Sequence, residues 1–357
     1  MRKIIATLVA ATMVAGSVCA CSKAPVQSSN LKIVTTIFPQ YDWVMNILGD
    51  NPAKADVTLL QDTGADLHSF QPTAADIIKV SECDLFIYVG GESDEWVDDV
   101  LKEATNKNMV VIDLMDELGD SVKEEEVVEG MQEEDEHEHD HGDHDEDHEH
   151  EEDHDHEDHD HEEDHDHEGH EHHHEEGEIE FDEHVWLSLK NAKVLVKSIS
   201  GVLQKIDPAN ASVYKANEDA YVAKLDGLDK QYQEAVDSAS VDTLLFGDRF
   251  PFRYLVDDYG LSYYAAFVGC SAESEASFET ITFLSKKTDE LSLHAVLTIE
   301  GKDHKIAETI VDNTVSKDQK ILSMDSMQSV TAADVTAGAS YFSIMESNLS
   351  VLKEALK

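Results

Sequence analysis

Histidine is the residue with the clearest chemical potential in this 357-residue chain, and its distribution is very uneven. Sixteen of the 20 histidines fall between His137 and His174, mostly as single residues flanked by Asp or Glu. Neutral imidazole combined with carboxylate suits zinc and, with less preference, copper, nickel or cobalt. This histidine-rich run therefore predicts loose binding of divalent metal. A solubilising acidic spacer is the alternative, but it leaves the density of imidazole unexplained.

Two of the four remaining histidines are candidate metal ligands. His68 stands in Gly-Ala-Asp-Leu-His, after a predicted strand at 55–61, so we expect it on a loop at the carboxyl end of that strand. His184 stands in Asp-Glu-His-Val-Trp-Leu, where apolar periodicity resumes. A surface-loop histidine and a helix-start histidine paired with Asp182 are the plainer interpretations. His294 precedes a strand and is interpreted as a turn residue.

The charge is strongly acidic and is concentrated in one segment. Lys and Arg total 26 and Asp and Glu total 77, which gives a formal net charge of −51. Residues 124–180 hold 32 of the acids and no base, so the other 300 residues have 45 acids against 26 bases. Nucleic-acid binding needs a basic footprint and is excluded. We expect the insert 124–178 to be disordered when it holds no metal.

The amino terminus predicts export and lipid anchoring. Arg2 and Lys3 precede the uncharged run Ile4 to Val18, which has the length of a signal segment and is short for a membrane span of about 20 residues. Cys21 follows Ala20 and is the predicted lipidation site. A simple secretory signal and a short membrane anchor are the alternatives. Residues 22–30 are small and polar and are typical of a tether.

Strand-like and helix-like segments alternate in two sets, which predicts an α/β fold with two lobes. The first set has strands at 31–38, 55–61, 85–89 and 110–114, with helices at 41–48, 73–80 and 95–106. The second has strands at 243–246, 262–267, 295–299 and 320–323, with helices at 254–259, 277–290, 305–313 and 340–356. Each set predicts a parallel sheet of roughly four strands with flanking helices.

A single long helix is predicted between the lobes, over residues 207–238, because apolar residues recur there at helical spacing. The expected organisation is a signal segment (1–21), a tether (22–30), an amino-terminal lobe (31–206) that contains the insert, the linking helix, and a carboxy-terminal lobe (239–357). A stiff connection of this kind restricts closure to small tilts. Ligands of open α/β sheets bind outside the carboxyl ends of the strands, so the predicted site is the cleft between the lobes.

The order of these motifs resembles the metal-specific solute-binding lipoproteins of bacterial ABC transporters, most closely the zinc-uptake (ZnuA-like) branch. The His68 loop, the histidine-rich insert and the His184 motif carry the resemblance, which covers about residues 31–357 apart from the insert. It implies that one metal ion is held between two lobes by side chains from both, and that the ion passes to a membrane permease.

The resemblance also implies a set of ligands. His68 and His184 match the two positions of the first lobe, Asp248 stands where a third ligand, usually histidine, follows the first strand of the second lobe, and Glu300 matches an acidic fourth ligand. Arg249 beside Asp248 leaves a salt bridge open as that residue's role. His304 and Cys270 are the alternatives for the third ligand, and the thiolate of Cys270 would suit zinc. Cys83 and Cys270 are expected to be separate thiols rather than a disulfide.

The sequence therefore predicts an extracytoplasmic zinc-binding lipoprotein, anchored to the bacterial cell membrane through Cys21 and expected to be monomeric. Manganese is the alternative ion, because two histidines with two carboxylates also suit it. A histidine-rich surface metal buffer related to cell-adhesion proteins is the alternative function. No catalytic motif of a hydrolase or a nucleotide-binding enzyme is found in the sequence, so an enzyme such as a metallohydrolase ranks last.

Overall fold

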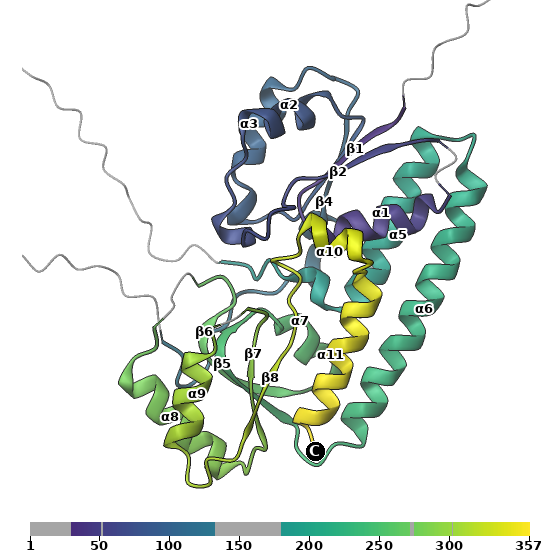
Figure 1. The fold of residues 1–357 in the computed structure, drawn as a ribbon. Helices are drawn as coiled ribbons and strands as arrows, with labels where there is room; N and C mark the ends of the chain where they lie inside the picture. Colours follow the sequence, from purple (N-terminus) through teal and green to yellow (C-terminus); the bar gives the residue numbers. More distant parts are fainter. Residues whose placement is uncertain (1–29, 51–52, 133–179, 272–274, 302) are drawn as a thin grey trace, which may run out of the picture.

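The computed structural model describes residues 30–50, 53–132, 180–271, 275–301 and 303–357 (Figure 1). The predicted signal segment with Cys21, the tether up to residue 29 and the histidine-rich run lie outside these residues. The described chain forms two α/β lobes, which lie one above the other in Figure 1, with long helices packed along one side of both. The predicted fold class is confirmed.

The amino-terminal lobe is built on four parallel strands in the order β2-β1-β3-β4. Each strand follows an apolar, partly β-branched run, and the first and third are almost completely buried. The strands are β1 (Lys32–Thr35), β2 (Asp56–Leu59), β3 (Leu85–Tyr88) and β4 (Val110–Asp113). The helices are α1 (Phe38–Leu48), α2 (Ala74–Glu82), α3 (Trp96–Glu103) and α4 (Leu114–Leu118).

The carboxy-terminal lobe repeats this topology with the strand order β6-β5-β7-β8, again all parallel. Its strands are β5 (Thr243–Phe250), β6 (Ser262–Val268), β7 (Ala295–Thr298) and β8 (Lys320–Ser323). Its helices are α7 (Arg253–Tyr259), α8 (Phe278–Glu290), α9 (Lys305–Asn313), α10 (Ala332–Ala337) and α11 (Tyr341–Ala355). In both lobes the second strand along the chain takes the edge beside the first, so β2 and β6 hold equivalent positions.

The long helix between the lobes is α6 (Ala211–Asp237), which spans 27 residues and about 40 Å. It begins four residues later than predicted, because Asp207 accepts hydrogen bonds from Asn210 and from the Tyr214 hydroxyl and forms a turn ahead of the helix. A second long helix, α5 (Leu189–Ile206), packs against it and was not predicted as a separate element. The connection is therefore a pair of helices rather than a single rod.

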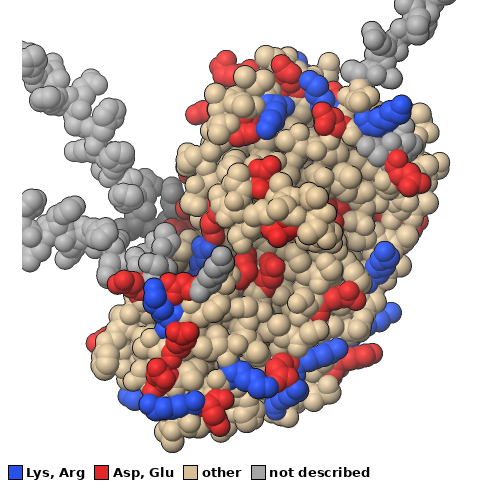
Figure 2. Space-filling view, in the orientation of Figure 1, with Lys and Arg blue, Asp and Glu red and all other residues tan. Residues whose placement is uncertain are grey.

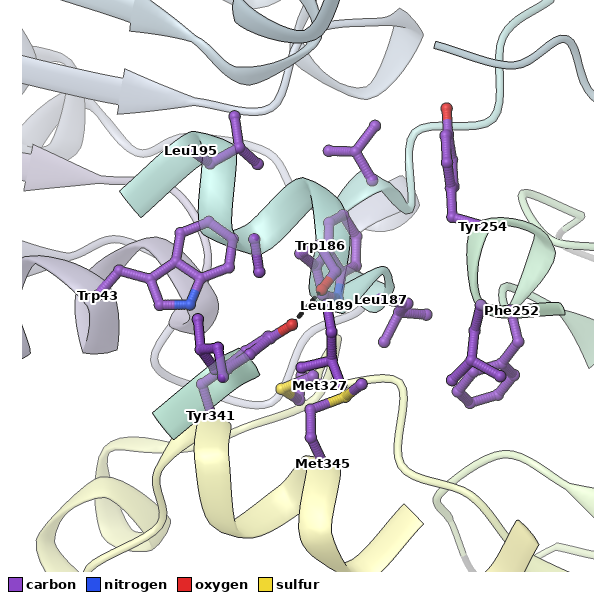
Figure 3. Close-up of a cluster of buried hydrophobic side chains, with 14 of the residues drawn as sticks. Trp43, Trp186, Leu187, Leu189, Leu195, Phe252, Tyr254, Met327, Tyr341 and Met345 are labelled. Carbon is purple, nitrogen blue, oxygen red and sulfur yellow. Dashed lines mark hydrogen bonds between the residues drawn. The ribbon is translucent and has the colours of Figure 1, made fainter. Parts of the chain in front are cut away.

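One hydrophobic core runs through both lobes (Figure 3). Trp43 of α1 packs edge-on against Tyr341 of α11, with ring centroids 5.2 Å apart. The Tyr341 hydroxyl donates to the Trp186 carbonyl oxygen at 2.7 Å, and the indole nitrogen of Trp186 donates to the Ser326 carbonyl oxygen at 2.9 Å. These buried contacts join the first lobe, the segment after the insert and the last helix, so the two lobes are fixed to each other on this side.

The predicted start of the insert at residue 124 requires a correction. Residues 124–132 are described and packed: Glu124 forms an antiparallel bridge with Phe181, and the Glu125 backbone nitrogen donates to the Glu180 carbonyl oxygen at 2.9 Å. Met131 is buried, and the Gln132 backbone nitrogen donates to the Ala266 carbonyl oxygen in β6. The many acidic residues led to the prediction of disorder for residues 124–132, whereas this segment packs through its backbone and the Met131 side chain.

The two cysteines of the described chain are free thiols, as predicted. Cys83 is the buried residue directly after α2, with its sulfur 3.4 Å from that of Met109, whereas Cys270 lies in the other lobe. On the face drawn in Figure 2, acidic and basic side chains are interspersed over both lobes. None of the helices in the described ranges has both the length and the apolar character needed to cross a bilayer.

We predict that the Asp42 carboxyl group makes the free energy of unfolding fall as the pH rises from about 4 to 6. Its buried carboxylate accepts from the Tyr341 backbone nitrogen and the Tyr221 hydroxyl, and burial raises its pKa to about 6. Because the folded state then holds a proton that the unfolded state has released, stability falls as the pH rises from about 4 to 6, by about 3 kcal/mol for this group at most.

Urea unfolding of the parent and of Asp42→Asn at pH 4, 5, 6 and 7 measures this contribution. The asparagine variant is expected to lose less stability across the window, whereas the exposed control Asp120→Asn should follow the parent. Parallel curves for the parent and Asp42→Asn would rule the assignment out.

Candidate metal centre

His68 is held on the loop after β2, in a short helical turn over Leu67–Ser69. The Asp66 carboxylate caps this turn by accepting from the His68 backbone nitrogen at 3.1 Å. The loop is fixed at its base to the carboxy-terminal lobe, since Thr63 forms a bridge with Thr331. Gly64 adopts a φ of 79° in the left-handed region there, and an added Cβ would lie 3.2 Å from the Ser329 carbonyl oxygen.

His184 is completely buried at the start of the turn that leads into α5. The Asp182 Oδ1 atom accepts from its backbone nitrogen at 2.8 Å and lies 2.9 Å from its ring Nδ1. An ionised carboxylate only accepts, so the proton of the ring is on Nδ1 and Nε2 carries a lone pair. The Tyr254 hydroxyl in turn donates to the Asp182 carbonyl oxygen at 2.7 Å and fixes this segment to α7.

The two imidazoles point their Nε2 atoms at each other across 3.3 Å. His68 Nδ1 lies 2.9 Å from Ser93 Oγ and 3.7 Å from Glu183 Oε2, which favours a proton on Nδ1 here too. Two lone pairs then face each other. Tetrahedral zinc with bonds of about 2.05 Å separates two nitrogen ligands by about 3.3 Å, so the spacing fits two ligands of one zinc ion.

The Cys270 sulfur lies beside this pair and is a candidate third donor. Its sulfur and the two imidazoles place one ligand atom each within 4.8 Å of one another, and this is the only such cluster of three among the residues that the structure describes. Cys270 follows β6, the counterpart of the strand that precedes His68. Gly269 permits the approach, because a Cβ there would lie 3.0 Å from the His184 ring.

The chemistry of this set suits zinc. A tetrahedral ion places sulfur about 3.6 Å from each nitrogen, so a sulfur that lies 4.8 Å from both nitrogens must move by about 1.3 Å. Burial raises the pKa of the Cys270 thiol, and nearby Glu125, Asp182 and Glu183 raise it further. A thiolate is therefore costly unless a cation offsets it. The same burial, together with His184, lowers the pKa of His68 to about 3, which keeps that ring neutral.

Asp248 and Glu300, the two predicted carboxylate ligands, lie near the imidazoles but use their oxygens elsewhere. Asp248 accepts from the backbone nitrogens of Arg249 and Ile299. Glu300 accepts from the backbone nitrogen and hydroxyl of Ser326, at 2.7 and 2.8 Å, and from other groups of residues 328–329. Both line one cavity of about 790 Å³ together with His68, but neither joins the three-donor cluster.

The strand geometry explains the position of Asp248. The predicted strand ended at Phe246, but β5 continues to Phe250 with a bulge between Phe246 and Arg249. Asp248 therefore lies within the strand and bonds to the end of β7 instead of projecting from a loop. His304 is the residue before α9, and its Nδ1 is buried without a hydrogen-bond partner among the described residues.

Three residues support the two imidazoles; the pairing of Asp182 with His184 was one of the interpretations of the sequence, whereas Ser93 and Glu183 were not assigned a role. Asp182 orients His184, while Ser93 and Glu183 flank His68, and the Ser93 backbone nitrogen donates to Glu183 Oε1 at 2.9 Å. Such outer contacts fix the orientation of metal-binding histidines. Asp182 and Glu183 stand directly before His184, so adjacency was the available signal, whereas Ser93 comes from a distant loop.

Comparison with known proteins places this geometry in context. The family model described as zinc-uptake complex component A, periplasmic, matches residues 33–355. The zinc-binding lipoprotein AdcA of Streptococcus pneumoniae is 30% identical over 360 residues, covering 99% of this chain and 61% of that protein. The high-affinity zinc uptake system protein ZnuA of Bacillus subtilis is 27% identical over 330 residues, covering 92% and 89%.

A solved structure is similar in fold as well. The Zn(II)-bound ZnuA-like domain of Streptococcus pneumoniae AdcA matches with a TM-score of 0.63 and 26% identity, covering 92% of this chain and 99% of that one. The chain spans 57–61% of the length of the streptococcal relatives that it matches. Because the family model matches nearly the whole chain, this protein belongs to the family of the periplasmic A component of zinc-uptake complexes.

Proposed function

We propose that the chain is the extracytoplasmic solute-binding component of an ABC-type zinc importer. The observation that carries this proposal is the pair of Nε2 atoms at 3.3 Å with the Cys270 sulfur beside them. In this role His68, His184 and Cys270 hold one Zn²⁺ ion between the lobes, and a membrane permease receives it. The relatives are named as a zinc-binding lipoprotein and a zinc uptake protein, which supports the choice of zinc.

The donor set also favours zinc over manganese, the alternative ion. Manganese prefers carboxylate, carbonyl and water oxygens, whereas a thiolate suits a softer ion. The carboxylates of Asp248 and Glu300 accept hydrogen bonds from backbone nitrogens, and Glu300 also accepts from Ser326 Oγ, so these bonds hold both carboxylates outside the three-donor cluster. We therefore propose that Asp248 and Glu300 line the cavity without binding the metal.

Two further parts of the proposal concern segments outside the described residues. We propose that Cys21 carries the lipid anchor and that the histidine-rich run binds metal loosely.

We predict that His68 and His184 hold the tight site. In a variant that lacks residues 133–176, His68→Ala and His184→Ala are each expected to weaken zinc binding by about 100-fold or more, about 2.7 kcal/mol, because each removes one of three ligands. Chelator-competition titration measures the affinity, and His294→Ala is the matched control. One tight ion per chain in the double variant would contradict the site, and loss of all binding on removing 133–176 alone would favour the metal buffer.

We predict that Cys270 binds the metal through sulfur. Cobalt(II) bound to a thiolate shows an intense near-ultraviolet charge-transfer band, whereas a set of imidazoles and carboxylates shows none. The parent loaded with Co²⁺ is expected to show the band, and Cys270→Ser to lose it while it still folds. Glu300→Gln should retain the band. Full intensity in Cys270→Ser would return the third position to an oxygen donor.

We predict a characteristic pH dependence of zinc affinity. Because burial raises the pKa of Cys270, the thiol is protonated at neutral pH and must release one proton when it binds the ion. His68 stays neutral, since its pKa is about 3. Between pH 6.5 and 8, zinc affinity should therefore rise about tenfold per pH unit in the parent lacking residues 133–176. Cys270→Ser should show a nearly flat profile, and equal slopes for the two proteins would exclude a thiolate ligand.

A further inference from the structure

Arg249 contacts both loops that carry the candidate ligands. It lies in β5 just after the bulge, and its Nη2 atom donates to the Asp66 carboxylate of the other lobe. Its Nη1 atom donates to the Ser271 carbonyl oxygen at 3.4 Å. Asp66 stands two residues before His68, and Ser271 directly follows Cys270. A single guanidinium group therefore connects the first-lobe ligand loop with the second-lobe ligand loop.

The Asp66 carboxylate is shared between this ion pair and the ligand loop itself. While Oδ2 receives the guanidinium, Oδ1 accepts from the His68 backbone nitrogen at 3.1 Å. The side chains of Arg249 and Asp66 are only 17% and 24% exposed, so the pair is shielded more than an ordinary surface ion pair. Guanidinium suits this task because its planar fork addresses two acceptors in fixed directions, which the point charge of lysine does not.

The position of this contact matters because the lobes are fixed to each other elsewhere. The aromatic contacts of Trp43, Trp186 and Tyr341 hold one side, whereas Arg249 and Asp66 meet across the cavity that His68 borders. Bonds to zinc are about 2.0–2.3 Å long, so a separation of the two loops by about 1 Å disrupts the coordination. We propose that Arg249 is a positioning residue that clasps the two ligand loops, and that opening of its pair with Asp66 controls the rate of metal release.

This proposal rests on the proposed function, and the charges of the pair make it specific. Arg249 places a positive charge near the site, which opposes a divalent cation, and Asp66 offsets that charge. Asp66→Asn therefore removes the clasp and leaves the positive charge uncompensated. Arg249→Met removes the clasp and the charge together. We expect Asp66→Asn to weaken zinc binding more than Arg249→Met does. The variant that combines Asp66→Asn with Arg249→Met should bind zinc more tightly than Asp66→Asn alone.

The test measures metal release from the full chain. The protein is loaded with Co²⁺, and the decay of the thiolate absorption is followed after rapid mixing with excess chelator, with Cys270→Ser as the blank. Arg249→Met is expected to release the ion at least about tenfold faster, with association changed by less than about threefold, as for outer contacts that orient ligands. Arg249→Lys keeps the charge but not the fork, and should fall between the parent and Arg249→Met.

Lys193→Met is the matched control, because Lys193 is also 17% exposed and pairs with Asp226 and Asp229 away from the cleft. Its release rate should equal that of the parent. If Arg249→Met folds and releases the ion within about twofold of the parent rate, the clasp is overturned. If Arg249→Met fails to fold, a parent-like rate in both Arg249→Lys and Asp66→Asn overturns it. Tight binding that survives in the His68→Ala, His184→Ala double variant overturns the proposed function instead.

Discussion

The organisation of the cleft depends on an electrostatic constraint: the Nε2 atoms of His68 and the fully buried His184 face each other across 3.3 Å, and with a proton on each Nδ1 atom their lone pairs repel. Burial and the neighbouring ring disfavour protonation of His68, so a proton relieves this repulsion poorly. A divalent cation relieves it well, because both lone pairs can bond to it. The fold therefore holds two groups that repel each other close together. A bound cation removes this repulsion, which adds to the free energy of metal binding.

The surrounding structure supplies the rigidity that this constraint requires. Asp182 fixes the ring of His184 and is itself fixed by Tyr254, while Asp66 fixes the backbone of His68. Behind these contacts, one aromatic core joins α1, α11 and the turn before α5, as Figure 3 shows. This shared core joins the two lobes on one side and therefore restricts their movement relative to each other.

The sequence predicted the parts of the molecule that depend on local patterns. The β-branched runs gave the parallel strands, and helical periodicity gave α6 to within a few residues. His68 and His184 became candidate ligands because each stands in a recognisable pattern of its own, and the structure brings their rings together. The positions of Cys270, Asp248 and Glu300 relative to the two histidines depend on contacts between distant parts of the chain. The bulge in β5 turns Asp248 toward Ile299, and a loop at residues 326–329 occupies Glu300, neither of which is visible in a local pattern. Cys270 was a secondary candidate because only the fold shows that its loop meets His184.

The paired backbone at Glu125 and Glu180 has a consequence for the length of chain that can lie between them. The backbones of Glu125 and Glu180 are hydrogen-bonded to each other, and the Gln132 backbone nitrogen bonds to Ala266 of the second lobe, so both sides of the segment between residues 132 and 180 are anchored. Lengthening a loop whose ends are already held costs little, about 0.6 kcal/mol for each doubling. Residues can therefore be inserted or deleted between these anchors at little cost in the free energy of folding, so the length of the chain there can change without disturbing the cleft.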